Sequence, residues 1–488
     1  MLHTRLTPID HFPPGNYATC CFYLPLSPHT TPSEAFAALK EGLRRTFAQL
    51  PWLGGKIYPM TAEAQGWRPG NLEIRYDPEK LDEAISTRLI FKELSEADAS
   101  YAGLQEDMFP TDSFPDEELI WAPALPDVTG GAECLVAQAN FLPGVCLLCV
   151  TVNHYATDGT GGFDIWKLWA DNCTASQAGV ALGAGPPPES SDRGVLERIW
   201  ERERTGRPLS DVDAVSWRML DLQPPGSEKD RVQNTEGYKS AAANMPQEIM
   251  RSAIFYIPPA AFANLSKATS QEASAEPGQI SSNDALCGLF WRCLLKARRA
   301  AATNAGLDVD GAQARLYLTL DARPDFSHDL PSPYLGNLSV MNLCDMPLVS
   351  LTSADTSVGS VSLAIRSVAD AARKAALMDA YAVARGMGNL ADLTLRGSSI
   401  RGFDMLLTSL LGYPLQNICF WGRVFDNQGR PEAFRPLMGS FNRFSRLCFF
   451  LPRKKHGGVE VIVNLFDDEM ELLLQDEEFG QYAVYLTS

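Results

Sequence analysis

The clearest hydrophobic pattern along the chain is an unbroken apolar run over residues 145–152. A run of this length, bounded by turn residues, is typical of a buried β-strand. A second apolar segment, residues 133–142, precedes it, and the Leu-Pro-Gly sequence at 142–144 predicts a hairpin-like turn between them. Three glycines at 159–162 and a helix-like segment follow. The pattern therefore predicts a core strand that ends in a glycine-rich turn.

Helical periodicity appears near the start of the chain. Thr31-Pro32-Ser33-Glu34 reads as a capping box with proline at the first helical position. The apolar positions after it predict one buried helical face, made of Phe36, Leu39, Leu43, Phe47 and Leu50.

The second half of the chain repeats this mixture of periods. Strands are predicted at 252–257, at 315–320 and at 459–465, and the second of them ends at Asp321-Ala322-Arg323. Ser281-Ser282-Asn283-Asp284 predicts the start of a long helix. The chain is therefore expected to be mixed α/β, with two similar α/β layers facing one another.

A change in amino-acid composition separates the two halves of the chain. Proline, glycine and charged residues dominate from about 172 to 245, including Gly183-Ala184-Gly185-Pro186-Pro187-Pro188, which cannot continue a helix or a central strand. This organisation predicts an N-terminal domain at 1–180, a crossover linker at 181–245 and a C-terminal domain at 246–488.

Composition narrows the functional classes. The chain has a formal net charge of −17 and a pI near 4.9, which argues against nucleic acid or an anionic membrane as partner. Its start lacks a signal-peptide pattern, and no apolar run is long enough to span a bilayer. The eleven cysteines lie in apolar contexts typical of buried free thiols, including Cys146 and Cys149 within the predicted strand. A cytoplasmic location is the expectation.

One histidine stands out among the six. His154 directly follows the predicted core strand, and the glycine-rich turn beside it leaves backbone room for a ligand. From the pattern alone, a general base and a buried structural histidine are equally compatible with this position. The sequence has no serine-hydrolase elbow, no zinc-ligand spacing and no dinucleotide-binding glycine motif after a strand, so no metal is expected.

Several segments, in the right order along nearly the whole chain, resemble the BAHD acyltransferase superfamily. The resemblance is strongest to its fungal, trichothecene O-acetyltransferase-like branch. The segments that carry it are Leu6-Thr7-Pro8-Ile9-Asp10, Leu50-Pro51-Trp52-Leu53-Gly54-Gly55, His154-Tyr155-Ala156-Thr157-Asp158-Gly159, Ser281-Ser282-Asn283-Asp284 and Pro333-Tyr334-Leu335-Gly336-Asn337.

The resemblance implies two chloramphenicol-acetyltransferase-like domains around a central tunnel, in a monomer. It also implies transfer of an acyl group, expected to be acetyl, from acyl-CoA directly to a hydroxyl (or an amine) of a fungal secondary metabolite. It implies that His154 is the general base, and that Asp158 points away from it and pairs with an arginine, for which Arg323 is the candidate. Gly159 is expected to let the turn form without a Cβ clash. Thr408 matches a family position near the reacting centre, although a strand-capping threonine is an equal alternative.

Acyl-CoA carries several negative charges, so an acidic protein needs local positive charge to bind it. The window 421–455 holds eight basic residues against two acidic ones, a local charge of +6. Arg423, Arg435 and Arg443 in this window, together with Ser282 at the predicted helix start, are the candidate CoA contacts. A solvent-facing charged loop is the alternative, especially for residues 453–455.

One motif departs from the family. Its second signature, Asp-Phe-Gly-Trp-Gly, is represented here by Cys419-Phe420-Trp421-Gly422, so the aspartate is a cysteine and one glycine is missing. Two other functions therefore stay open. One is a condensation-type catalyst that uses carrier-protein thioesters, which usually has a second histidine where this chain has Asn153. The other is a non-acylating protein that has kept the fold.

Overall fold

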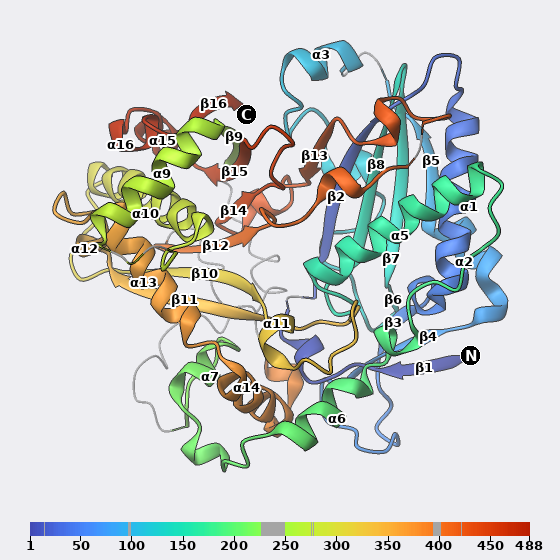
Figure 1. Ribbon diagram of the computed structural model, residues 1–488, viewed down its shortest axis with the longest axis horizontal. Coiled ribbons are helices and arrows are strands. Elements are labelled where there is room, and N and C mark those ends of the chain that lie inside the picture. The colour runs from blue at the N-terminus through green and yellow to red at the C-terminus, as the bar shows by residue number, and fades with distance from the viewer. Residues whose placement is uncertain are drawn as a thin grey trace.

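The computed structural model describes residues 1–488 except 14, 96–98, 226–248, 275, 277, 394–401 and 421. Two lobes of mixed α/β structure stand side by side (Figure 1). The lobe on the right is formed mainly by the first half of the chain, and the lobe on the left by the second half. The predicted mixed α/β class is confirmed.

A five-stranded sheet organises the N-terminal lobe, in the hydrogen-bonded order β13-β2-β8-β7-β5. All neighbouring strands are antiparallel except β5 and β7, which are parallel. β7 and β8 form the predicted hairpin. The strands are β13 (Ala433–Pro436), β2 (Tyr17–Pro25), β8 (Val145–Asn153), β7 (Leu135–Leu142) and β5 (Leu89–Glu93).

β8 is buried on both faces, which explains its continuous apolar sequence. Cys146, Leu148, Val150 and Val152 lie in the core cluster shared with α1 (Pro32–Gln49) and α5 (Gly159–Gln177). Alternate residues of the strand face a second cluster, whose other members include Leu104 of α3 (Tyr101–Glu106) and Leu119 of α4 (Asp116–Leu119). The strand is therefore a rigid support for the turn that follows it.

Smaller elements complete this lobe. A four-stranded antiparallel sheet has the order β1-β4-β3-β6. The predicted capping box at Thr31 and Glu34 is present at the start of α1. The bounds are β1 (Leu2–Arg5), β4 (Leu72–Tyr76), β3 (Lys56–Pro59), β6 (Ala132–Glu133) and α2 (Leu81–Arg88).

A seven-stranded mixed sheet organises the C-terminal lobe, in the order β11-β10-β12-β14-β15-β9-β16. The strands are β11 (Ser339–Pro347), β10 (Gln313–Asp321), β12 (Asp404–Ser409), β14 (Leu447–Phe450), β15 (Val459–Leu465), β9 (Arg251–Ile257) and β16 (Val484–Thr487). The helices of this lobe are α9 (Pro259–Glu272), α10 (Ser282–Asn304), α12 (Leu348–Thr352), α13 (Val358–Asp370), α15 (Asp467–Leu474) and α16 (Glu477–Gly480).

The central helix of this lobe is α10. Ser281 and Asp284 form its capping box, and most of the helix is buried, including Leu286, Phe290 and Cys293. The three strands and the helix predicted for the second half are therefore confirmed.

The described part of the crossover is folded and packed. Its helices α6 (Gly194–Glu203) and α7 (Ala214–Arg218) share a buried apolar cluster with α11 (Arg323–Phe326) and α14 (Lys374–Gly386). Ile9 and Tyr334 also belong to this cluster, which lies below both sheets in Figure 1. The rest of the predicted linker, residues 226–245, lies outside the described residues. The boundaries of the two domains stay a prediction.

All eleven cysteines are free, and ten of them are buried, as their apolar contexts predicted. Within the described part of the chain, no helix is both long and apolar enough to cross a bilayer.

Candidate active site

The amide groups of the turn after β8 bind residues close by in the structure. The amide of Ala156 donates to the carbonyl of Asn153 at 2.8 Å, and the side-chain oxygen of Asn153 accepts from the amide of Tyr155 at 3.0 Å. The amide of His154 donates to the carbonyl of Asn16 at 3.0 Å. His154 thus begins a tight turn at the end of a fully buried strand.

The imidazole of His154 is not fixed by a carboxylate. Its Nδ1 atom is buried and has no hydrogen-bond partner among the described residues. Burial lowers the pKa of His154, and the nearby charge of Asp158 offsets only part of this effect. A ring with a lowered pKa is neutral at pH 7 and able to accept a proton.

Asp158 uses its carboxylate to join the two lobes. Arg323 donates to Oδ2 and Oδ1 at 3.0 and 2.8 Å, so the ion pair that the family resemblance implied is present. The amides of Leu338 and Gly161 and the hydroxyl of Ser339 also donate to these two oxygens. Burial alone would raise the pKa of Asp158, but Arg323 and these donors lower it.

The start of α5 requires a glycine, but at a different position from the one expected. A Cβ at Gly161 would lie 2.3 Å from the Thr157 hydroxyl and 2.9 Å from the carbonyl of Leu335. A Cβ at Gly159 would meet only the hydroxyl of Tyr413, at 3.4 Å. The expectation that Gly159 prevents a clash is therefore wrong, because the close approach of the 335 backbone falls two residues later.

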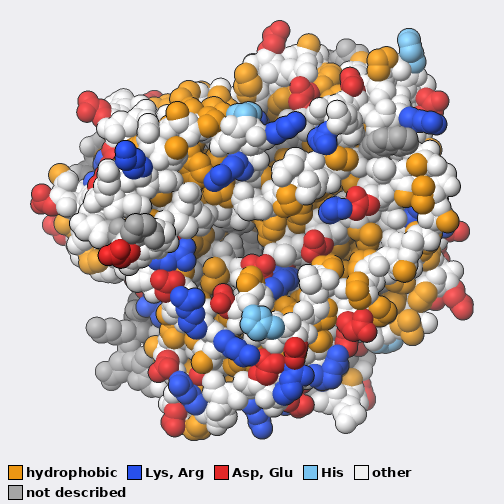
Figure 2. All heavy atoms as spheres, in the orientation of Figure 1, with side chains coloured by type: hydrophobic (Ala, Val, Ile, Leu, Met, Phe, Trp, Pro, Cys, Tyr) orange, Lys and Arg blue, Asp and Glu red, His pale blue; other side chains and the backbone are white. Residues whose placement is uncertain are grey.

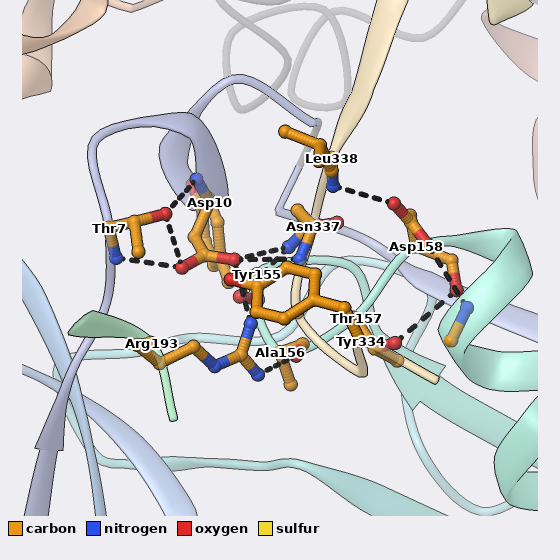
Figure 3. A network of polar contacts seen from close by, with 12 residues as sticks. Thr7, Asp10, Tyr155, Ala156, Thr157, Asp158, Arg193, Tyr334, Asn337 and Leu338 are labelled. Carbon is orange, nitrogen blue, oxygen red and sulfur yellow. Dashed lines mark hydrogen bonds and ion pairs between the residues drawn. The ribbon is translucent and has the colours of Figure 1, made fainter. Parts of the chain in front are cut away.

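A second buried carboxylate, which the sequence did not single out, lies on the other side of the turn. Asp10 is fully buried and accepts from Arg193 Nη1 at 2.9 Å and from the main-chain and side-chain nitrogens of Asn337 at 3.0 Å each (Figure 3). Its other oxygen accepts from the amide and the hydroxyl of Thr7. Burial alone would lower the pKa of Arg193, but the charge of Asp10 raises it.

Asn337 and Arg193 reach from Asp10 to the turn itself. The Asn337 side chain donates to the carbonyls of His154 and Tyr155 at 3.0 and 3.2 Å, and Arg193 donates to the carbonyl of Ala156. These residues come from three distant parts of the chain, so no local pattern marks them. The only sequence signal was that Asp10 and Asn337 fall in blocks that resemble the family.

Two other predicted residues, Thr408 and Ser282, lie near one another at the ends of β12 and α10. Thr408 is half-buried, and its neighbour Ser409 donates to the side chain of Asn283 at 2.6 Å, beside Ser282. The segment after β12 then reaches the turn region, because the hydroxyl of Tyr413 lies 2.9 Å from that of Thr160. Burial raises the pKa of Tyr413 to about 12. Neither Tyr413 nor Thr160 was singled out from the sequence.

The three predicted arginines have different surroundings. Arg423 is exposed, and Arg443 is half-buried at the end of a short 3-10 helix (Phe441–Arg443). Arg435 is buried within β13, and its guanidinium donates to Glu460 and to the carbonyls of Met108, Phe109 and Phe434. Figure 2 shows Lys and Arg side chains spread over one face among acidic ones, without a single large basic patch.

The altered signature lies far from His154. Phe420 is fully buried, and Thr174 and Gln177 of α5 donate to the carbonyls of Cys419 and Phe420. Trp421 lies outside the described residues. Thr174 lies sixteen positions after Asp158 along α5, which is roughly 24 Å at the rise of an α-helix. The change from aspartate to Cys419 therefore acts at the opposite end of α5 from the turn.

One cluster has the residue types of a metal site: Cys293, Asp476 and Glu478. Lys296 lies among them, with Nζ 2.5 Å from Asp476 and 3.1 Å from Glu478. Burial holds the pKa of Cys293 well above its ordinary value, which keeps the thiol protonated. The ammonium group of Lys296 already supplies the positive charge that these carboxylates need.

Comparison with known proteins identifies the family to which the chain belongs. A model described as the transferase family matches residues 132–480, and one described as a trichothecene 3-O-acetyltransferase-like N-terminal domain matches residues 17–173. The isocyanide synthase-NRPS hybrid crmA of Aspergillus fumigatus is 28% identical over 98% of this chain, which spans 31% of the length of that relative. Eremophilane O-acetyltransferase ORF8 of Penicillium roqueforti is 23% identical, with 99% of this chain and 98% of that protein covered.

A solved structure supports the same fold. F. graminearum TRI101 complexed with coenzyme A and deoxynivalenol matches with a TM-score of 0.75 and 20% identity, and each chain is covered fully. The match to the transferase family extends over most of the chain, from β6 to α16. The chain therefore belongs to the transferase family, and its residues 17–173 match the model of a trichothecene 3-O-acetyltransferase-like N-terminal domain.

Proposed function

We propose that the protein is a CoA-dependent acyltransferase that transfers an acetyl group to a hydroxyl of a small secondary metabolite, with His154 as general base. The observation that carries this proposal is the state of His154. Its ring has a lowered pKa and a buried Nδ1 without a described partner, while Asp158 is fully engaged with Arg323. In a structural histidine of a protein core, the buried ring nitrogens are usually hydrogen-bonded.

In the proposed reaction, His154 takes the proton from the acceptor hydroxyl, and the oxygen attacks the carbonyl of the thioester. The tetrahedral oxyanion collapses and expels the CoA thiolate, which receives the proton from the imidazolium. Both substrates react directly, so no acyl-enzyme forms. General base catalysis of this kind typically contributes ~10²–10⁴-fold to the rate.

The hydroxyl of Thr408 is the proposed donor to the oxyanion. It lies on a strand that leads directly to Ser409 and then to Tyr413, which contacts the start of α5. A preorganised hydroxyl at the reacting carbonyl typically contributes ~10²-fold or more to kcat. The alternative is that Thr408 only completes β12, where it pairs with Phe449 of β14.

For the CoA phosphates we propose Arg423 and Arg443, with Ser282 at the N-terminus of α10. The N-terminal end of a long helix favours anions because its amides and dipole are positive. Arg435 is left out of this proposed set because its donors are bound within the protein. F. graminearum TRI101, which shares the fold, is a protein solved with coenzyme A.

A second function is favoured by one finding. The chain matches, over nearly its whole length, less than a third of an isocyanide synthase-NRPS hybrid. We therefore keep a condensation-type reaction, with a carrier-protein thioester as donor, as the alternative. Asn153 argues against it, because its side chain binds the amide of Tyr155 and supports the turn instead of offering a second imidazole.

The test is a thiol-release assay with acetyl-CoA and a panel of hydroxylated secondary metabolites, run with the wild type, His154→Ala and His328→Ala. His328 is exposed and serves as the matched control. We expect acceptor-dependent CoA release that is lost in His154→Ala and kept in His328→Ala, with both variants folded by circular dichroism. Release that survives in His154→Ala would overturn the general-base assignment. Release from a carrier-protein thioester but not from acetyl-CoA would favour the condensation-type reaction.

A further inference from the structure

The turn that carries His154 is held by side chains through its carbonyl oxygens. The carbonyls of His154 and Tyr155 accept from Asn337, and that of Ala156 accepts from Arg193. Asn337 belongs to the second half of the chain, 183 residues after His154. The carbonyls of a turn usually accept hydrogen bonds from water or from amides of the same segment. Here three consecutive carbonyls instead accept from buried side chains of other segments, which is unusual.

The orientation of Asn337 is determined by its surroundings. Its Nδ2 faces three oxygens: Asp10 Oδ1, the carbonyl of His154 and the carbonyl of Tyr155, all within 3.2 Å. Its main-chain nitrogen donates to the same Asp10 oxygen. The amide NH₂ group offers two N–H donors to these three acceptors, whereas the amide oxygen could donate to none of them, so the reverse orientation of the side chain is excluded.

The turn needs such a support because no hydrogen bond from the described residues to Nδ1 orients the imidazole of His154. In a Ser-His-Asp arrangement a carboxylate bonded to Nδ1 orients the imidazole. Here the oxygens of Asp158 are bound by Arg323, Leu338 and Ser339, and Nδ1 of His154 has no partner among the described residues. The ring is therefore placed by the backbone of its turn rather than by a contact to its nitrogen.

We propose that Asn337, held in place by Asp10, is a positioning residue for His154. The proposal rests on the proposed function, since it assumes that the imidazole acts as base. Asn337 clamps the main chain of the turn, and Asp10 connects this clamp to Arg193, which holds the next carbonyl (Figure 3). The second half of the chain thereby fixes the base that the first half carries.

The test compares Asn337→Ala with Asn342→Ala. Asn342 is also buried, its Nδ2 also donates to a main-chain carbonyl (that of Ile365), and its Oδ1 is likewise without a described partner. It lies in β11 and does not contact the turn. The two variants remove the same atoms from similar surroundings, so a difference between them reports on the position of His154 rather than on burial.

We expect kcat for acyl transfer to fall by ~10²-fold in Asn337→Ala, because a small displacement of a catalytic group has that effect. The KM for acetyl-CoA should change little, and Asn342→Ala should keep the kcat of the wild type even if it melts earlier. Equal kcat values in the two variants, or a loss that appears only in KM, would overturn the positioning role.

A second readout is independent of turnover. Histidine resonances of the labelled protein give the pKa of His154 by titration, with His154→Gln for assignment. In Asn337→Ala the loosened turn should let water reach the ring, so its pKa should rise towards the ordinary value of about 6.5. Asn342→Ala should leave it unchanged. If the wild type transfers no acyl group but the pKa of His154 still shifts in Asn337→Ala only, the positioning holds and the proposed function fails. If the pKa does not shift, the positioning is overturned.

Discussion

Two buried carboxylates, Asp158 and Asp10, lie on either side of the His154 turn, and they support this turn in different ways. Each pairs with an arginine, Arg323 or Arg193, and each accepts a main-chain amide from the segment 337–338. Asp158 is the first anchor, a residue of the turn itself that reaches outward to the second lobe. Asp10 is the second anchor and lies outside the turn, so it acts through Asn337 and Arg193.

The difference shows which kind of support can be read from a sequence. Asp158 lies four residues from His154, so spacing alone marks it. Asp10 lies 144 residues away, and its partner Arg193 belongs to a segment that looks like a linker. A short sequence motif therefore reveals Asp158, which is close to His154 in the sequence, but not Asp10 and Arg193, which are distant from it.

The largest loss of stability is expected when the arginine that pairs with either carboxylate is removed. Arg323→Ala and Arg193→Ala each leave a buried carboxylate without its cation, so each should lower the free energy of unfolding by ~3–5 kcal/mol. Urea denaturation followed by tryptophan fluorescence measures both. Asp158→Ala combined with Arg323→Ala should recover part of the loss, because no unpaired charge remains.

A control for the loss of an arginine from an ion pair is Arg366→Ala, in which a half-buried arginine leaves Asp284, the carboxylate that caps α10 away from the turn. It should lower stability without changing the pKa of His154. A loss below ~1 kcal/mol for Arg193→Ala would contradict the equivalence of the two anchors.

Acid should remove two contributions to stability in sequence, first that of His11 and then that of Asp158. His11 lies beside Asp10 and is held neutral, because its Nε2 accepts from the amide of Leu72; burial is the main cause of its lowered pKa. Its contribution to stability is complete above its ordinary pKa of 6.5 and is lost as the pH falls below that value towards the lowered one. The pKa of Asp158 is also lowered, so its contribution persists until the pH falls below 3.8.

Stability measured by urea denaturation from pH 7.5 to 5 should therefore decline in the wild type and decline less in His11→Asn. His328→Asn, which changes an exposed histidine, serves as the control. A decline of the same size in His11→Asn would assign the pH dependence to another group.

The smallest expected effects come from single hydroxyls. Ser339 donates to Asp158 at 3.1 Å, and Thr7 donates to Asp10 at 2.7 Å. A hydrogen bond to a charged group contributes ~1.5–3 kcal/mol, and both carboxylates keep several other donors. Ser339→Ala and Thr7→Val should therefore lower the free energy of unfolding near the lower end of that range. A larger loss in Thr7→Val than in Arg193→Ala would show that Thr7, rather than Arg193, is the principal partner of Asp10.

Much of the fold could be predicted from local patterns. The buried strand β8, the capping boxes of α1 and α10 and the strand β15 are each encoded by consecutive residues. Charge is less informative, because a count of basic residues does not show where each points. Arg435 contributed to the local excess of +6, yet it is buried and paired with Glu460. Long-range pairs such as Asp10 with Arg193 leave no periodic signal at all.

The strand β13 has a consequence for how this protein can be divided. It comes from residues 433–436 but completes the five-stranded sheet by pairing with β2. A fragment that stops before residue 433 would leave one side of β2 without its partner. An open strand edge is a template on which another chain can pair, so such a fragment would be prone to self-association. The first lobe is finished only when about nine-tenths of the chain has been made.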